Sequence, residues 1–491
     1  MRIFLCYPPV SEEYNKIRDS GLAPHLSILC IASHLKSKSN DLTFKICDGH
    51  HMPAEEMKNE IIDFEPEIIG YSVDFTNYNN AVLLADFAKS RFPDVWNVMG
   101  SNHASNLYRE ILCNQKSIDF ISIGDGEPSM EDLVRARRGE LRPDECSNLA
   151  CRDPESGDVI LTEKKLFDLS EMTDVDYDLI DLAPYFAQQE RVMGSGFRML
   201  QFTSQRGCAN KPLCVFCGRY TDGIRFRDSD RYAREIAYWA EKLDLTEVWD
   251  RSDSFIQSFS WLKKFCEALK KHTDRFLTGR TTFKTYARAD QLLRSETIAM
   301  LKELNFRMVF IGYEAGDDRI LGNIGKHATL DIYRRATRNV LENGLEIDAS
   351  FIVGLPGENK ESLANHISFV RELVSMGLDK IRVNRLLVLP GTPLYGAVMR
   401  AFPELQGKDS IPQDVLQEKI FMTDLYDLKE FGNDPHIFEE HLRAAAETMT
   451  GAILETGGGA EGYGYGKDRN LLAGNQFLSK NNSRIEKKNG D

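Results

Sequence analysis

Three cysteines lie close together in a chain whose other cysteines are widely spaced. Cys208 is followed by five residues and then Cys214, and two more residues separate Cys214 from Cys217. Thiolates at such short spacings can converge on one metal centre, and iron–sulfur clusters are held by cysteine thiolates. Three ligands leave one iron of a [4Fe–4S] cluster open, whereas a structural zinc site usually needs four ligands. The spacing therefore favours an iron–sulfur cluster, with a zinc site or inert buried thiols as alternatives.

The other seven cysteines show no such clustering. Free cysteine is among the most buried residue types, so we expect these thiols in the core. They are Cys6, Cys30, Cys47, Cys113, Cys146, Cys151 and Cys266. No signal peptide and no run of about 18 apolar residues is visible. We therefore expect reduced thiols, a cytoplasmic protein and no membrane span.

The charge of the chain limits its partners. The 491 residues carry a net charge of −14, whereas non-specific binding to nucleic acid needs a basic surface. We expect no nucleic-acid partner, and a small-molecule or peptide substrate is favoured. The length allows two to four domains.

Residues up to about 135 alternate short apolar runs with helical patterns. The runs span residues 2–7, 43–47, 68–73, 95–99 and 120–123. This alternation predicts a parallel, doubly wound α/β sheet. Ligands of such sheets bind at the carboxyl ends of the strands. The turns at those ends are 8–9, 48–51, 72–77, 100–105 and 124–127.

A second series of strands and helices runs from residue 197 to about residue 394. Its strand candidates are 199–203, 247–249, 282–287, 308–313, 348–353 and 380–387. Six strand–helix units predict an open or partial (β/α)6 barrel with its chemistry at the carboxyl ends of the strands. The cysteine cluster directly follows the first of these strands.

These patterns define the expected domains. Residues 1–140 form the doubly wound domain, 141–195 a hairpin and linker, and 196–398 the partial barrel. Residues 399–491 are expected to be a mainly helical C-terminal domain with a polar tail. Within it, the Gly- and Tyr-rich stretch 457–466 is interpreted either as a loop over the active site or as a connector.

The barrel segment resembles the radical SAM superfamily, in which a [4Fe–4S] cluster cleaves S-adenosylmethionine (SAM). Segment 204–208 is similar to the exit of the family's first strand, and segment 214–217 to the end of its cysteine motif. The family usually has three residues between the first two cysteines, and this chain has five. Further motifs match in order at 252–255, 286–290, 311–316, 351–358 and 389–394.

The resemblance implies that residues at these strand ends contact SAM. The matching residues are Asp253, Ser254, Arg288, Glu314, Ile352, Gly354 and Leu389. The glutamate of the fourth strand would approach SAM, and the fifth motif would lie against the adenine. A structural ion pair is the alternative for Glu314. No catalytic residue beyond the cofactor ligands is predicted.

The first 135 residues resemble the cobalamin-binding domain that precedes many radical SAM cores. The resemblance implies a flavodoxin-like domain whose strand ends hold cobalamin. The matching residues are Pro8, Pro9, Ser72, Val73, Gly100, Ser101, Asn102, His103, Gly124, Gly126 and Glu127. The family more often has a second glycine at the position of Ser101. The Ser101 side chain should narrow the space through which a ligand approaches the backbone.

Three histidines of this domain have different expected roles. Asp48-Gly49-His50 is similar to the start of the Asp-x-His-x-x-Gly motif of base-off cobalamin modules, but residue 53 is proline and the motif belongs after the first strand. We therefore interpret His50 as part of a polar loop near the ligand, with the lower face of cobalt empty or bound to water. His25 is expected to cap a helix, and His103 to contact corrin side chains or cap a turn.

Together the resemblances imply a cobalamin-dependent radical SAM enzyme, with C-methyltransferase as the leading interpretation. One SAM would methylate cobalamin, and a second would supply a 5′-deoxyadenosyl radical after reduction by a donor such as flavodoxin or ferredoxin. Ring formation or rearrangement without methyl transfer is one alternative. A radical SAM enzyme that has lost cobalamin is another, and a non-catalytic iron–sulfur or zinc protein is a third.

Overall fold

The N-terminal domain is built on a sheet whose parallel strands follow the order β2-β1-β3-β4-β5, extended by the antiparallel hairpin β6-β7. The computed structural model describes residues 1–11, 21–219 and 223–462. The strands are β1 (Arg2–Tyr7), β2 (Thr43–Asp48), β3 (Ile68–Ser72), β4 (Trp96–Gly100), β5 (Phe120–Ser122), β6 (Leu149–Arg152) and β7 (Val159–Leu161). The order 2-1-3-4-5 is that of a flavodoxin-like fold, which confirms the predicted fold class.

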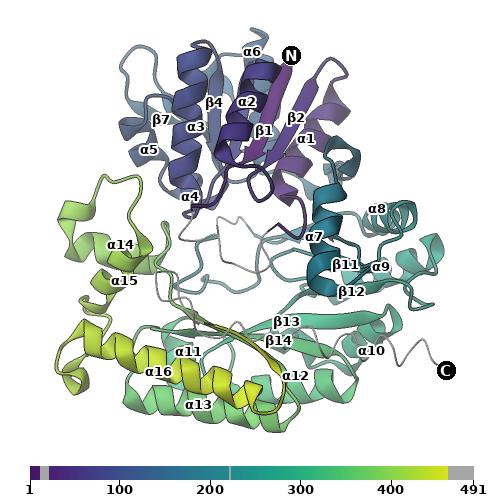
Figure 1. Ribbon diagram of the computed structural model, residues 1–491, viewed down its shortest axis with the longest axis vertical. Coiled ribbons are helices and arrows are strands. Elements are labelled where there is room, and N and C mark those ends of the chain that lie inside the picture. The colour runs from purple at the N-terminus through teal and green to yellow at the C-terminus, as the bar shows by residue number, and fades with distance from the viewer. Residues whose placement is uncertain (12–20, 220–222, 463–491) are drawn as a thin grey trace.

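Helices cover both faces of this sheet (Figure 1). On one face α1 (Leu26–Lys38) contacts α6 (Gly126–Arg137), and on the other α2 (Ala54–Phe64) contacts α3 (Tyr78–Arg91). Strands covered on both faces are apolar throughout, and β3 is buried along its whole length. The strand order reverses between β1 and β3, so a crevice opens at their carboxyl ends.

The second sheet has the order β16-β15-β14-β13-β12-β11-β8, and all neighbouring strands are parallel. The strands are β8 (Met199–Phe202), β11 (Glu247–Asp250), β12 (Thr282–Ala287), β13 (Phe306–Glu314), β14 (Glu346–Val353), β15 (Lys380–Arg385) and β16 (Gly459–Gly462). The first and last strands of this order do not pair, so the sheet is an open partial barrel, as predicted.

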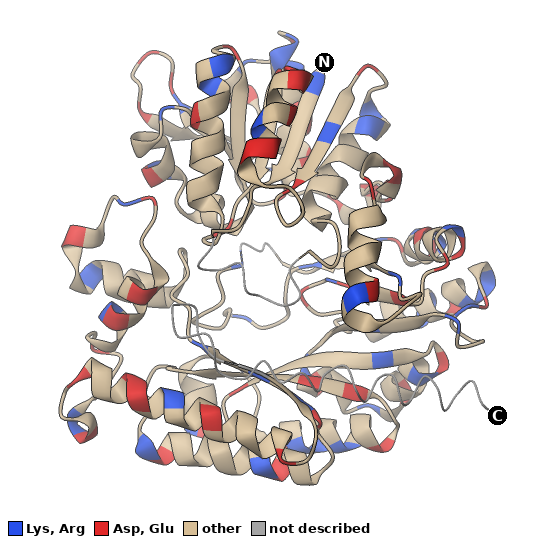
Figure 2. Cartoon of the chain, viewed as in Figure 1, with Lys and Arg blue, Asp and Glu red and all other residues tan. Residues whose placement is uncertain are grey.

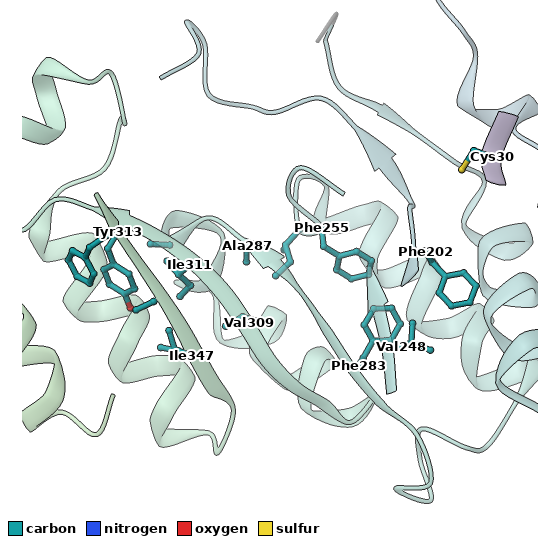
Figure 3. Close-up of a cluster of buried hydrophobic side chains, with 14 of the residues drawn as sticks. Cys30, Phe202, Val248, Phe255, Phe283, Ala287, Val309, Ile311, Tyr313 and Ile347 are labelled. Carbon is teal, nitrogen blue, oxygen red and sulfur yellow. The ribbon is translucent and has the colours of Figure 1, made fainter. Parts of the chain in front are cut away.

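The two faces of the barrel sheet carry different side chains because successive residues of a strand point to opposite faces. Val248, Phe283 and Ile347 belong to the buried apolar layer that packs beneath the helices (Figure 3). These helices are α8 (Ser229–Lys242), α9 (Phe259–His272), α10 (Ser295–Glu303), α11 (Asp318–Asn323), α12 (Leu330–Glu342) and α13 (Lys360–Ser375). The alternate positions, such as Trp249 and Asp348, face a cavity instead.

The C-terminal region is mainly helical, as predicted. It contains α14 (Pro393–Ala401), α15 (Gln413–Phe421) and α16 (Pro435–Leu454). Helix α16 packs against α13 and β15, and Gly459–Gly462 adds the edge strand β16 to the barrel sheet. The start of the Gly- and Tyr-rich stretch is therefore neither a connector nor an active-site loop. A glycine-rich edge strand has almost no hydrophobic alternation, which explains why the pattern missed it. Residues 463–466 lie outside the described residues.

The predicted hairpin and linker join the two sheets. The hairpin β6-β7 completes the first sheet, and α7 (Ala183–Met193) bridges to the second (Figure 1). On α7, Tyr185 donates to Asp48 (2.9 Å), and Gln189 donates to the carbonyls of Leu22 and Met199. In the part of the chain that the structure describes, no helix is long and apolar enough to cross a membrane.

Candidate active site between the two sheets

A cavity of about 980 Å³ lies where the carboxyl ends of the two sheets face each other. Basic residues mark the loops in this space (Figure 2). Many predicted site residues line the cavity together. They are Cys208, Cys214, Cys217, Asp253, Arg288, Glu314, Ser72, Gly100, Ser101, Asn102, Gly124, Gly126 and Glu127. The fold thus brings residues of both predicted cofactor sites to one cavity.

The cysteine loop leaves the short hairpin of β9 (Gln205–Arg206) and β10 (Arg225–Phe226). Gly207 turns the chain with φ +96°, and a Cβ there would lie 1.9 Å from the carbonyl oxygen of Gly223, so only glycine fits. Its N–H donates to Asp253 Oδ2 (2.7 Å). Ser252 Oγ accepts the N–H groups of Ser204 and Gln205 (2.9 and 3.0 Å). The β11 exit therefore fixes the start of the cysteine loop.

The five-residue gap between the first two cysteines is folded around Asn210, whose side chain is buried. Its Nδ2 donates to the carbonyl of Gly325 (2.7 Å) and lies 3.4 Å from Cys214 Sγ. Its main-chain N–H donates to Cys208 Sγ (3.5 Å). The longer spacing therefore supplies an amide that ties two cysteines to the end of α11.

Two charged residues of the predicted SAM set also have protein partners. Arg288 donates to Asn210 Oδ1 (2.7 Å), which links β12 to the cysteine loop. Glu314 has φ +62°, and Lys326 Nζ donates to its carboxylate (2.7 Å). A Cβ on Gly312 would lie 2.1 Å from that carboxylate, so this glycine makes room for the pair. The ion-pair alternative for Glu314 is thus observed, at a carboxylate that still faces the cavity.

An apolar slot leads from the cavity into the N-terminal domain. Its walls include Leu5 of β1, Ile31 of α1, Val98 of β4 and Met130 of α6. A Cβ on Gly70 would lie 2.7 Å from Leu5, and one on Gly126 would lie 2.7 Å from Ile31. Missing side chains thus keep the slot open at the β1–β3 switch point, where doubly wound sheets bind ligands.

The acidic turn after β5 is occupied by arginines of the barrel. Arg206 forms ion pairs with Asp125 (2.8 Å) and Glu127 (2.5 Å), and Arg225 pairs with Asp125 (2.5 Å). Burial alone would raise the pKa of Asp125, but the two guanidinium groups outweigh it and hold this pKa below its usual value. Glu127, which we expected to contact cobalamin, lines the cavity and also holds Arg206, the residue that precedes Gly207.

Two histidines stack on the ring of Tyr7 at the cavity wall. The ring centroid of His25 lies 4.3 Å from that of Tyr7, and its side chain makes no capping bond to α1, so the prediction of a helix cap was wrong. Burial lowers the pKa of His25 to about 4, which leaves the imidazole neutral at physiological pH. His50 Nδ1 bonds to Asp48 (2.9 Å). It lines the cavity, which agrees with a polar loop near a ligand.

Family models match two parts of the chain. The model of the radical SAM superfamily matches residues 202–370, and that of the B12 binding domain matches residues 19–134. The chain is a radical SAM enzyme with an N-terminal B12-binding domain. Its cofactors are a [4Fe–4S] cluster, SAM and cobalamin.

Relatives of this radical SAM enzyme differ in the reactions their names give. The chain is 26% identical over 383 residues to the anaerobic magnesium-protoporphyrin IX monomethyl ester cyclase of Rubrivivax gelatinosus, covering 76% of this chain and 66% of the cyclase. It is 25% identical over 406 residues to an uncharacterized methyltransferase of Pyrococcus horikoshii, covering 80% of this chain and 82% of that protein.

Two solved structures share the fold of the B12-binding radical SAM enzyme. OxsB, a cobalamin-dependent SAM radical enzyme, matches with a TM-score of 0.65 at 19% identity, covering 83% of this chain and 57% of OxsB. The radical SAM methyltransferase TsrM from Kitasatospora setae matches with a TM-score of 0.64 at 14% identity, covering 80% of this chain and 76% of TsrM. The chain thus spans little more than half of OxsB and about two thirds of the cyclase.

The residues present fit the cofactors of the radical SAM enzyme. Three free thiols open onto one cavity, and burial raises the pKa of Cys214 to about 11, so iron would displace its proton. Among the described residues no three Cys, His, Asp or Glu side chains converge tightly enough for a single metal ion. The apolar slot suits the flat nucleotide base of cobalamin.

Several predicted SAM residues lie outside the cavity lining. Ser254 donates to Gln291 (2.6 Å), and Ile352 packs against the apolar core. The N–H of Gly354 donates to Glu358 (2.8 Å). Leu389 packs on Gly218, beside Cys217. The order of motifs along the chain predicts which residues lie at a strand end. It does not predict the direction in which each side chain points.

Four predicted cobalamin residues also lie outside the lining. The carbonyls of Pro8 and Pro9 accept hydrogen bonds from asparagines of the β3–α3 segment, and Val73 is fully buried. Buried His103 bonds through Nε2 to the carbonyl of Asp409 (3.2 Å), because its place on α4 (Ser101–Asn106) turns it away from the cavity. Ser101 lines the cavity with φ +77°, a conformation that glycine adopts more easily.

The sequence prediction missed an aromatic floor on the barrel sheet. The rings of Trp249 and Phe310 are stacked at 5.4 Å, and Arg251 lies 4.3 Å from the Trp249 ring. Arg251 donates to the hydroxyl of Tyr286 (2.6 Å). Among the described residues it has no carboxylate within ion-pair distance, unlike Arg206 and the other arginines of the cysteine loop. Alternation along β11, β12 and β13 is the signal that could have identified this floor.

Proposed function

We propose that this radical SAM enzyme is a cobalamin-dependent C-methyltransferase that modifies an unactivated carbon of a small molecule or peptide. The observation that supports the proposal is the continuity of one cavity from the cysteine loop to the apolar slot of the B12-binding domain. A substrate between them would reach both cofactors without leaving this cavity. Cofactors and substrate that fill the cavity would exclude water and protect a radical from side reactions.

The bound cofactors supply hydrogen abstraction by a SAM-derived radical and a methyl group carried on cobalamin. The protein's part is to bind, orient and enclose. Cys208, Cys214 and Cys217 would hold the cluster, and Asn210, with Arg288 behind it, keeps their loop in place. The pair of Arg206 and Glu127 keeps this loop in register with the B12-binding domain.

The aromatic floor is the proposed substrate surface. Trp249, Tyr286 and Phe310 offer apolar area, and Arg251 offers a cation without a carboxylate partner in the described chain. A substrate with an apolar or flat part and an anionic group would complement both features.

Ring formation is the second candidate. The cyclase relative supports it, but the similarity covers 66% of the cyclase and 82% of the P. horikoshii methyltransferase, which favours methyl transfer. The two reactions use the same cofactor sites, so the product decides between them.

The test is anaerobic reconstitution with iron, sulfide and cobalamin, followed by turnover of a candidate-metabolite panel with SAM that carries a deuterated methyl group. Flavodoxin or ferredoxin would serve as electron donor. We expect 5′-deoxyadenosine, S-adenosylhomocysteine and a product that carries the label, measured by mass spectrometry. The Cys217→Ala variant should release no 5′-deoxyadenosine. An unlabelled product formed with 5′-deoxyadenosine would exclude the methyltransferase and support ring formation.

A further inference from the structure

A stack of three rings borders the cavity on the side of the N-terminal domain. Tyr7 ends β1, and its ring lies between the imidazoles of His25 and His50, with centroid distances of 4.3 and 4.8 Å. Both histidines line the cavity. The Tyr7 hydroxyl donates to Asp74 (2.9 Å), so the middle ring is held from beyond the stack.

Among the described residues, His25 is held at one ring nitrogen. Ser27 Oγ lies 3.0 Å from His25 Nδ1 and 3.2 Å from Oγ of Ser72 at the end of β3. Within residues 1–11, 21–219 and 223–462, no hydrogen bond engages His25 Nε2. Histidines that bind metals usually have the nitrogen away from the metal fixed in this way, which orients the ring.

The position of His25 distinguishes it from His50. His50 follows β2, which lies beyond β1 at the edge of the sheet. His25 lies on the other face of Tyr7 and connects through Ser27 to β3. It therefore stands over the crevice between β1 and β3, where the strand order reverses and the apolar slot begins.

The apolar slot bears on which group can coordinate the lower face of cobalt. A nucleotide base held in the slot cannot also coordinate cobalt, so the lower position of the metal is left to another ligand. The neighbouring cavity wall offers an oriented imidazole whose Nε2 has no hydrogen-bond partner in the part of the chain that the structure describes. Imidazole nitrogen is a good ligand for first-row transition metals such as cobalt.

We propose that His25 Nε2 ligates the lower face of cobalt when cobalamin is bound to this enzyme. The inference rests on cobalamin binding. It assigns a protein ligand to the lower face of cobalt, which the sequence predicts to be empty or bound to water. His50, although it carries the Asp-x-His pattern, serves as a stacking partner of Tyr7 and not as the ligand.

The test is electron paramagnetic resonance of the full chain loaded with cob(II)alamin, with the iron–sulfur cluster kept in its oxidised, silent state. A nitrogen ligand splits each cobalt line into three for ¹⁴N and into two for ¹⁵N. Protein grown with ¹⁵N-histidine should show pairs where unlabelled protein shows triplets. His25→Gln should bind cobalamin and lose the splitting, and His50→Gln should retain it.

Each other outcome overturns the inference. Triplets that persist with ¹⁵N-histidine would place the nucleotide base on cobalt, and unsplit lines would mean water or no ligand. Loss of the splitting in His50→Gln, with retention in His25→Gln, would assign the ligand to His50. If the His25 variant fails to fold, the labelled wild-type protein still shows whether a histidine binds cobalt, and the splitting in His50→Gln shows whether that histidine is His50. A wild-type protein that binds no cobalamin would overturn the proposed function itself, which separates the two failures.

Discussion

Single side chains hold the cysteine loop in a form that a cluster can use. Gly207 permits the turn before Cys208, and Asn210 fills the gap before Cys214. Buried amides near sulfur act on more than geometry, because hydrogen bonds to the sulfurs are among the features that set the reduction potential of an iron–sulfur cluster. Asn210 is therefore both a structural and an electronic residue of the loop.

Replacing Asn210 with alanine should make the cluster harder to reduce. The variant loses the Nδ2 group that lies 3.4 Å from Cys214 Sγ, so the added electron is less stabilised. One hydrogen bond is worth about 1 kcal/mol, which corresponds to a shift on the order of tens of mV toward negative potential. An EPR-monitored redox titration measures it. Asn384→Ala, on an exposed side chain of β15, is the control. An unchanged potential in Asn210→Ala would contradict this role.

At the scale of the elements, one connection between a strand and a helix buries a titratable side chain. The connection from β14 to α13 buries Glu358, whose Oε2 accepts the N–H of Gly354 while Oε1 has no hydrogen-bond partner among the described residues. Burial raises the pKa of Glu358 to about 8 and lowers that of nearby His366 to about 4. Both side chains are thus neutral between about pH 4 and about pH 8, and the segment is a packed support of the barrel.

The stability of this connection should fall as pH rises from about 6.5 to about 8. In that range the unfolded Glu358 is already ionised while the folded side chain keeps its proton, so the free energy of unfolding decreases by about 1–2 kcal/mol. His366 does not contribute there, because it is neutral in both states above pH 6.5. Glu358→Gln should remove this part of the slope in thermal unfolding measured against pH. Glu361→Gln, on the exposed first turn of α13, should keep it; equal slopes for all three proteins would refute the argument.

At the scale of the whole molecule, ion pairs beside the cavity join the barrel to the N-terminal domain. Arg206 leaves the barrel just before the cysteine loop and pairs with Glu127 at the start of α6. The Glu127 side chain is only 2% exposed, so each charge depends on the other. This contact couples the cluster site to the B12-binding domain.

Glu127→Gln should destabilise the protein and loosen both cofactors together. The variant loses one of the two carboxylate partners of Arg206, and a hydrogen bond to a charged group is worth about 1.5–3 kcal/mol; Asp125 still pairs with the guanidinium. We expect a lower melting temperature and lower retention of both iron and cobalamin after gel filtration. Glu131→Gln, on the same helix but half-exposed beside His34, is the matched control and should behave like the wild type. Loss of cobalamin alone would argue that Glu127 contacts the cofactor and not the barrel.

Much of this architecture could be predicted from local patterns. Apolar runs and helical periodicity located both parallel sheets, and the spacing of Cys208, Cys214 and Cys217 predicted a cluster site in the loop that follows the first barrel strand. Such patterns suffice because a strand or helix is specified by residues adjacent in sequence, and parallel strands bring their carboxyl ends together wherever they occur.

The tertiary structure alone decided which side chains face the cavity and what they meet there. Glu127 and Arg206 are 79 positions apart, and no pattern links them. His25 resembles a helix cap in sequence. In the structure its ring stacks on Tyr7 of β1, and Ser27, which also contacts Ser72 of β3, holds its Nδ1, so the imidazole lies at the cavity wall. The glycine-containing segment 459–462 forms a strand because it pairs with the open edge of β15. The sequence thus determined the elements and the cofactor class, and the assembled fold decided the partner of each side chain, because contacts between distant residues exist only after the elements have packed.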